Sequence, residues 1–125
     1  MNKRSKWKAS HKCCMICGWS DNLPWPHPGW LPRLEAHEII GGGLRDLSLK
    51  TLALQLVVCQ YCHQEVIPTM RHRDGVAYQL AIKLLRDPTH FSLSEANKVA
   101  SLRYVPFTDL EIIKLAKAIS LESLA

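Results

Sequence analysis

Two Cys-x-x-Cys pairs constrain this chain more than any other feature of its sequence. Cys14 pairs with Cys17 and Cys59 with Cys62, which leaves Cys13 over. Each pair can present two thiolates from one tight turn, and zinc takes four such ligands in a tetrahedron. The sequence therefore predicts one structural zinc site. Because residues 18–58 separate the pairs, instead of the ~15–20 residues of a compact finger, the metal would join two distant stretches.

Disulfides and a thiol redox pair are the alternatives to zinc. The first ten residues carry charge with no apolar segment behind them, so we expect no secretory signal and reduced thiols. Neither pair lies in a βαβ pattern, which a thioredoxin-like site requires. No apolar run approaches the ~18 residues of a membrane-spanning helix. We therefore expect a cytoplasmic protein with structural zinc and no membrane partner.

The charge of the chain favours a polyanionic partner. The formal net charge is +5, and residues 1–12 hold several cations and no acid. These residues predict a mobile basic arm, which either contacts phosphates or only solubilises the terminus. A second cationic cluster surrounds His72 and is either a phosphate contact or a solvated loop. The predicted nucleic-acid-binding residues are Lys3, Arg4, Lys6, Lys8, Lys12, Arg71 and Arg73.

The segment between the cysteine pairs predicts a loop followed by two strands. Residues 21–32 are rich in proline and tryptophan, so they form neither helix nor central strand, and we expect packing on the zinc site over base stacking. Residues 34–40 and 52–58 are apolar stretches typical of strands, separated by a glycine-rich turn. After the second pair, residues 64–66 begin a short helix that Pro68 should end.

The last part of the chain predicts three helices. Apolar residues recur at helical spacing from residue 74 to the Asp87-Pro88 break. Capping boxes at Ser92 and Thr108 open two more helices, to about residues 102 and 121. These helices carry no catalytic constellation, so their apolar faces should form core, with a homodimer surface as a further option. The expected organisation is a basic arm (1–12), a zinc-clamped core (13–70) and a helical extension (71–125), packed as one compact domain.

A Cys-x-x-Cys pair, a strand with His37-Glu38-Ile39, a glycine-rich loop and an apolar strand leading into Cys59-Gln60-Tyr61-Cys62-His63 follow one another in this order. The arrangement, over residues 14–66, resembles the HNH, or His-Me finger, endonucleases of the zinc-clamped type. The resemblance implies an α+β fold with a ββα-metal core, here carrying a C-terminal helical extension. It also implies one divalent cation held against the scissile phosphate.

The resemblance assigns roles to four residues. His37 and His63 would hold the catalytic cation, and Glu38 occupies the position of the general base, so either Glu38 or His37 activates water. The central asparagine of the family is missing, and Gln55 is the amide nominated to orient the motif or touch the metal in its place. Ser48 and Thr51 are poorer candidates for that role.

Phosphodiester hydrolysis needs an activated water and a cation that offsets charge on the phosphate oxygens. Two imidazole ligands favour Mn²⁺, Ni²⁺ or Zn²⁺ over Mg²⁺. Neighbouring residues of a strand point to opposite faces, so His37 and Glu38 can reach one ion only where the strand ends or bulges. The expected function is metal-dependent cleavage of DNA. The alternatives are an RNA-directed nuclease and a zinc-stabilised module, catalytically inactive, that binds nucleic acid or protein.

Overall fold

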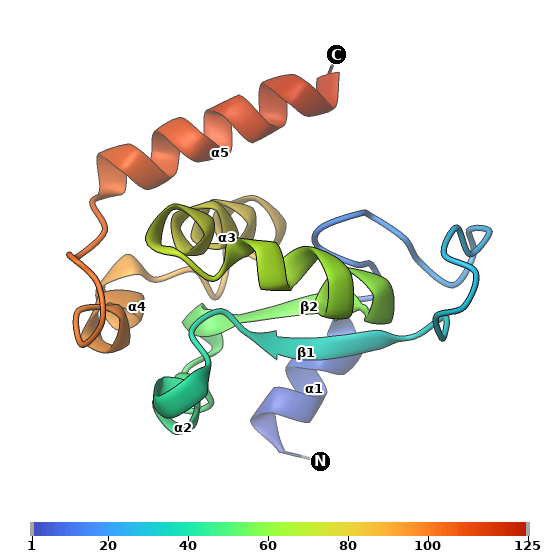
Figure 1. Cartoon of the computed structure of the whole chain (residues 1–125), viewed down its shortest axis with the longest axis horizontal. Coiled ribbons are helices and arrows are strands. Elements are labelled where there is room, and N and C mark those ends of the chain that lie inside the picture. Colours follow the sequence, from blue (N-terminus) through green and yellow to red (C-terminus); the bar gives the residue numbers. More distant parts are fainter. Residues whose placement is uncertain (1, 125) are drawn as a thin grey trace. The chain divides into compact units, whose positions relative to one another are not determined.

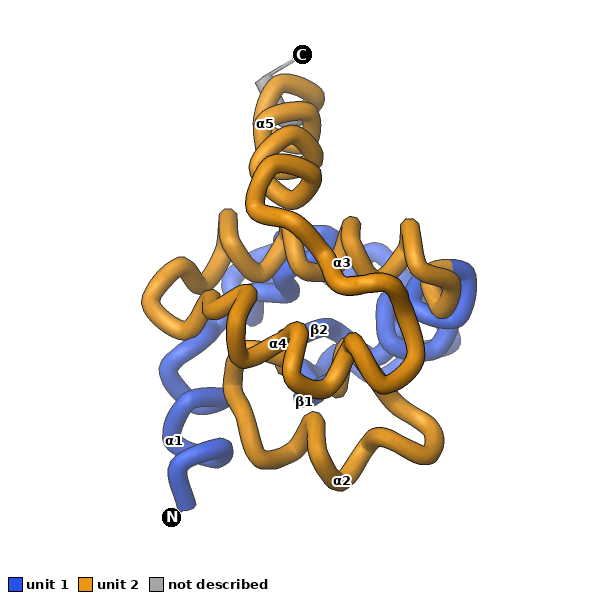
Figure 2. The backbone as a smooth tube through the Cα atoms, turned by 90° about the vertical axis from the view of Figure 1, so that its left-hand side faces the viewer, with its two compact units in different colours: residues 1–37, 56–69 blue, residues 38–55, 70–125 orange. Residues whose placement is uncertain are grey.

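The computed structural model describes residues 2–124 as a small α+β protein with a two-stranded antiparallel sheet (Figure 1). The chain divides into two compact units (Figure 2). Unit 1 comprises residues 1–37 and 56–69, and unit 2 comprises residues 38–55 and 70–125. Among the described residues, no helix has the length and apolarity needed to cross a bilayer.

Unit 1 begins with helix α1 (Lys3–Ser10). The prediction of a mobile arm is wrong for these residues, because an N-cap and one buried side chain stabilise a helix. The Asn2 side chain accepts a hydrogen bond from the Ser5 amide at 2.8 Å, which is an N-cap, and Trp7 is buried. Lys3, Arg4, Lys6 and Lys8 therefore lie on a helix, whereas Lys12 follows it.

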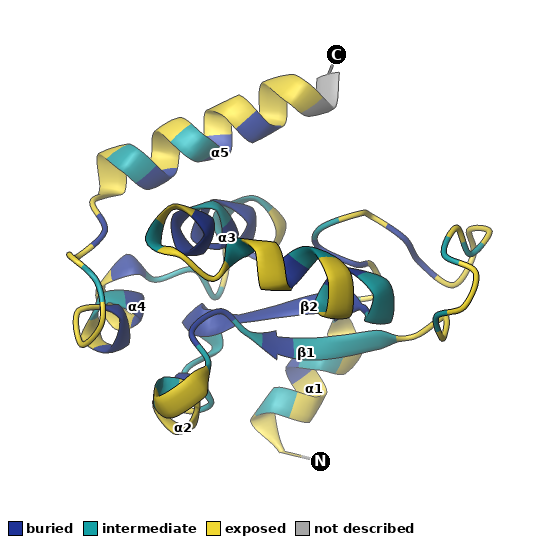
Figure 3. Cartoon of the chain, viewed as in Figure 1, coloured by how far each residue is buried: buried dark blue, intermediate teal, exposed yellow. Residues whose placement is uncertain are grey.

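The sheet pairs β1 (Leu34–Glu38) with β2 (Gln55–Cys59). Every residue of β2 is buried, whereas β1 is mostly half-buried (Figure 3). Both strands are shorter than predicted. Residues 52–54 form the 3₁₀ turn η2 (Leu52–Leu54) because the Thr51 hydroxyl accepts from the Ala53 amide and caps a turn before the strand begins.

A helical segment follows the second cysteine pair. It consists of the π-helical turn η3 (Cys62–Val66) and the 3₁₀ turn η4 (Ile67–Met70). Pro68 does not end the helical path as predicted. The proline lies in the first turn of η4, where a backbone N–H has no helical partner to lose, so the path continues to Met70.

Unit 2 contains the short turns η1 (Gly42–Leu44) and α2 (Arg45–Ser48) and the helices α3 (Arg73–Arg86), α4 (Leu93–Ala100) and α5 (Asp109–Leu124). Both capping boxes have the expected N-cap bonds. Ser92 Oγ accepts from the Glu95 amide at 3.2 Å. Thr108 Oγ1 accepts from the Glu111 amide at 3.2 Å, and Glu111 Oε1 accepts from the Thr108 amide at 2.8 Å.

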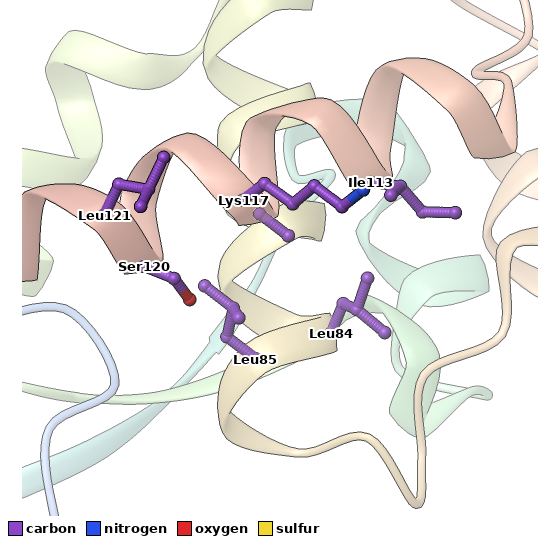
Figure 4. Close-up of a pocket in the computed structure, with 7 residues that line it drawn as sticks. Leu84, Leu85, Ile113, Lys117, Ser120 and Leu121 are labelled. Carbon is purple, nitrogen blue, oxygen red and sulfur yellow. The ribbon is translucent and has the colours of Figure 1, made fainter.

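Helix α5 packs on α3 through Ile112, Ala116 and Ile119, which recur at helical spacing and are buried. Beside this contact lies an apolar groove of about 450 Å³ (Figure 4). Leu84 and Leu85 of α3 and exposed residues of α5 line it. A homodimer through this face stays a prediction.

Candidate metal centre and histidine pair

The four paired cysteines of unit 1 form a cluster that could hold a structural metal such as zinc. Their sulfur atoms all lie within 4.8 Å of one another. The Sγ atoms of Cys17 and Cys59 are 3.8 Å apart, and no cysteine is in a disulfide. A tetrahedron with Zn–S bonds of ~2.3 Å has S···S edges of about 3.8 Å. The spacing across the two pairs therefore fits tetrahedral zinc.

Each pair folds into a turn with the same hydrogen bond. The Cys17 amide donates to Cys14 Sγ, and the Cys62 amide donates to Cys59 Sγ, both at 3.4 Å. Such bonds stabilise a thiolate and fix the direction in which its sulfur points. Gly18 follows the first pair with a φ of 81°, a left-handed conformation in which a side chain would be strained. The turn thus depends on its glycine.

Backbone pairing with β2 brings the two distant pairs together. The Met15 amide, between the first two cysteines, donates to the Val57 carbonyl at 2.8 Å. In return, Met15 Sδ accepts from the Val57 amide at 3.4 Å. Because Val57 lies two residues before Cys59, this pairing sets the first turn beside the second.

The thiols of the cluster compete for negative charge. A hydrogen bond from Cys62 lowers the pKa of Cys14 to about 5, and the same bond raises the pKa of Cys62. Burial, together with the neighbouring thiols, raises the pKa of Cys17 to about 11. Cys14 therefore ionises readily, and its negative charge opposes ionisation of Cys17 and Cys62. A divalent cation offsets this repulsion, which is the chemistry of a four-thiolate zinc site.

The proline-rich loop packs on the second cysteine pair, as predicted. His27 stacks on Tyr61, with ring centroids 3.8 Å apart and an interplanar angle of 11°. Trp25 contacts both His27 and Trp19 edge-on, at 5.1 and 4.7 Å. Since Tyr61 lies between Cys59 and Cys62, this aromatic cluster covers one side of the cysteine turn.

His37 and His63 lie side by side although they are distant in sequence. His37 is on β1 and buried, His63 is on η3, and their ring centroids are 5.1 Å apart. Glu35 Oε1 lies 2.9 Å from His63 Nδ1. The bond leaves His63 Nε2 without a hydrogen-bond partner among the described side chains, and the His63 side chain is 27% exposed. A carboxylate on one ring nitrogen orients the other toward a metal or a proton.

Glu35 is the residue that the sequence analysis missed. Burial opposes its ionisation, but hydrogen bonds from His63 and from Arg33 Nε, the latter 2.8 Å long, outweigh burial and lower the pKa of Glu35. The sequence does offer one signal for Glu35, which is its position relative to His37. Glu35 is two residues before His37, and alternate residues of a strand share a face.

The other two residues with a predicted catalytic role, Glu38 and Gln55, contact groups outside the His37–His63 pair. Alternation along β1 directs Glu38 away from the face of Glu35 and His37, and Arg45 Nε lies 3.7 Å from its Oε1. Gln55 is fully buried in unit 2. Its Nε2 donates to the backbone carbonyls of three residues before β2, at 3.2–3.5 Å: Ser48, Leu49 and Thr51.

The predicted phosphate-binding cations differ in their surroundings. Lys3, Lys6 and Lys12 are exposed, as is Arg71. Arg73 instead holds α5 in unit 2, because its guanidinium binds both carboxylate oxygens of Glu111 and the carbonyls of Val105 and Pro106. Comparison with protein-family models, curated proteins and solved structures gives no match for this chain.

Proposed function

We propose that this protein is a metal-dependent endonuclease that hydrolyses DNA phosphodiester bonds, with a zinc-clamped core of the HNH type. The observation that carries the proposal is the pairing of His37 with His63, whose ring centroids are 5.1 Å apart. These are the two histidines at the ends of the motif. The order of β1, β2 and the helical turn η3 also matches the order of a ββα-metal unit.

His63 is the better placed of the two to hold the catalytic cation. Glu35 occupies Nδ1, so Nε2 is the ligand atom, and a carboxylate behind a ligating histidine raises its basicity and fixes its ring. His37 would be the second nitrogen ligand or the base. When bound, the cation offsets the negative charge that develops on the phosphate oxygens.

The general base is His37 in this proposal. The sequence left Glu38 and His37 open, and two observations favour the histidine. Glu38 alternates to the other face of β1, and its carboxylate is paired with Arg45. His37 faces the same side as Glu35 and its ring neighbours that of His63, so with a cation held by His63 it would be placed to take a proton from the attacking water.

Gln55 replaces the missing asparagine by holding the connection between the strands. Its side-chain amide donates to three backbone carbonyls that precede β2. These hydrogen bonds fix the connection to the first residue of that strand. It is thereby a positioning residue, with no direct role at the metal. The Ser48 hydroxyl, at 2.6 Å from the Ile40 carbonyl, braces the same connection.

The test is incubation of supercoiled plasmid with the protein and Mg²⁺, Mn²⁺, Ni²⁺ or Zn²⁺ in turn. We expect nicked or linear product with at least one metal, and His63→Ala should abolish it. His72→Ala serves as the matched control, because His72 caps the N-terminus of α3 and lies outside the motif. Equal cleavage by parent and His63→Ala would refute the proposal.

A zinc-stabilised nucleic-acid-binding module is the second candidate. It is favoured by the engagement of Glu38 with Arg45, which leaves the expected base position facing away from the histidine pair. Duplex binding without cleavage in any of the four metals would establish this function instead.

A further inference from the structure

A hollow of about 310 Å³ opens in unit 1 between the end of α1 and the residues that lead into β1. We name it the basic hollow. Its lining combines cationic side chains with a small apolar wall. The lining residues are Lys8, Ala9, His11, Lys12, Asp21, Pro32, Arg33 and Leu34.

We propose that the basic hollow is a phosphate-binding subsite that takes one phosphodiester group of a nucleic-acid strand. The choice of nucleic acid rests on the proposed function. Lys8, Lys12 and Arg33 contribute three positive charges, against one negative charge from Asp21 and one from Glu35, which is ion-paired with Arg33. This excess exceeds what the end of α1 needs, because a helix C-terminus carries only about half a negative charge.

Arg33 gives the basic hollow its selectivity for phosphate. Its Nε is bound to Glu35 Oε2 at 2.8 Å. The two Nη groups have no hydrogen-bond partner among the described residues, and the side chain is 56% exposed. Two parallel N–H donors match two oxygens of a phosphate, whereas an ammonium acts as a point charge. Unlike Arg33, Lys8 and Lys12 form no ion pair among the described residues of the chain.

The hydrogen bonds place the basic hollow next to the histidine pair. Arg33 binds one oxygen of Glu35, and the other oxygen of Glu35 binds His63. One carboxylate therefore separates the phosphate-binding guanidinium from the candidate metal ligand. A strand held at Arg33 would have its neighbouring phosphates close to His63. The apolar wall of Ala9, Pro32 and Leu34 would contact the sugar beside the bound phosphate.

The test compares two double variants with the same change in charge. Lys8→Gln with Lys12→Gln removes two cations from the basic hollow, and Lys50→Gln with Lys114→Gln removes two exposed cations that lie outside it and have no predicted role in nucleic-acid binding. Affinity for a short duplex is measured against salt concentration, with no divalent cation added, so the assay is independent of cleavage. Retained helicity by circular dichroism verifies folding.

Loss of one phosphate contact should lower the slope of log K against log salt by about 0.9 in the first variant only. Equal loss in both variants would overturn the subsite, as would an unchanged slope or failure of the parent to bind duplex. Weaker binding of phosphatidylserine vesicles, without an effect on duplex, would also overturn it. If inorganic phosphate, but not duplex, shifts the NMR signals of Arg33, the site takes the free ion and the nucleic-acid assignment fails. Selective slope loss with no cleavage in any metal would keep the subsite and refute the nuclease.

Discussion

Arg73 and Glu111 form a two-pronged ion pair between α3 and α5, with Nη1–Oε2 at 3.0 Å and Nη2–Oε1 at 2.9 Å. The arginine also lies over the Phe107 ring, 4.4 Å from its centroid. Glu111 is at the same time the last residue of the α5 capping box, which begins at Thr108. One carboxylate therefore closes the start of α5 and ties it to α3.

Glu111→Gln should lower the free energy of unfolding by about 1 kcal/mol at neutral pH, because glutamine can keep the capping box and loses only the ion pair. Arg73 holds the pKa of Glu111 below the ordinary 4.5. The contribution is thus present above pH 4.5 and is lost as the pH falls through the lowered value. Urea unfolding of parent and variant across this range measures it. A difference that grows on acidification would contradict the prediction.

Zinc removal should unfold unit 1, since metal-binding energy at such sites is also folding energy. We expect Cys59→Ser to lose zinc and helical circular dichroism together. Cys13→Ser is the matched control, because Cys13 is exposed and lies outside the cluster of four. Elemental analysis gives the stoichiometry, and folded, never-chelated protein without zinc would contradict the assignment.

Gly75→Ala should destabilise unit 2 by about 1–3 kcal/mol, as overpacking does. An added Cβ would lie 2.5 Å from backbone atoms of Met70, which cannot move aside as a flexible side chain can. Gly43→Ala is the control, because nothing lies within 4 Å of its added Cβ. Urea midpoints compare the two variants, and equal midpoints would refute the steric argument.

Lys83→Met should cost up to about 3–5 kcal/mol of stability, because it removes the buried cation that faces the Asp87 carboxylate, which also contacts the His90 ring. Lys83 is fully buried, and its Nζ donates to Asp87 Oδ2 at 2.6 Å and to the Gln55 carbonyl at 2.8 Å. Lys98→Met removes an exposed ion pair with Glu95 and should change stability by less than ~1 kcal/mol. Thermal unfolding of both variants tests the contrast, which similar losses would refute.

Substitutions of the two glutamates of β1 distinguish Glu38 from His37 as the general base. Glu35→Gln should lower cleavage roughly 10–100-fold and raise the metal concentration needed for half-maximal rate, since Glu35 orients His63. Glu38→Gln should cleave near the parental rate. His37→Ala should cleave more slowly by a factor of ~10²–10⁴, because it removes the general base. Loss of cleavage in Glu38→Gln with the parental metal requirement would make Glu38 the base.

Local signals in the sequence predicted local structure well. The boxes at Ser92 and Thr108 predicted helix starts because the capping bonds span three residues. The Cys-x-x-Cys spacing predicted the cysteine cluster for a similar reason, since each turn is built from neighbouring residues.

Features that depend on distant packing were not predictable in the same way. The α1 helix requires burial of Trp7, which no periodicity in a short basic segment reveals. The bond between Glu35 and His63 requires β1 to lie beside η3. The engagement of Arg73 by Glu111 requires α5 to fold back on α3. In each case the two residues are distant in sequence, and only the tertiary fold determines that they are in contact.

The aromatic cluster around the cysteines would make metal binding at this site visible by spectroscopy. Trp19, Trp25 and Trp30 all belong to the network around His27 and Tyr61, and Tyr61 is flanked by two of the candidate ligands. Tryptophan emission depends on the polarity around the indole, so release of the metal would expose these rings and move their emission to longer wavelength. Tryptophan emission of the unmodified protein would therefore report metal occupancy of the cysteine cluster, with neither substrate nor label.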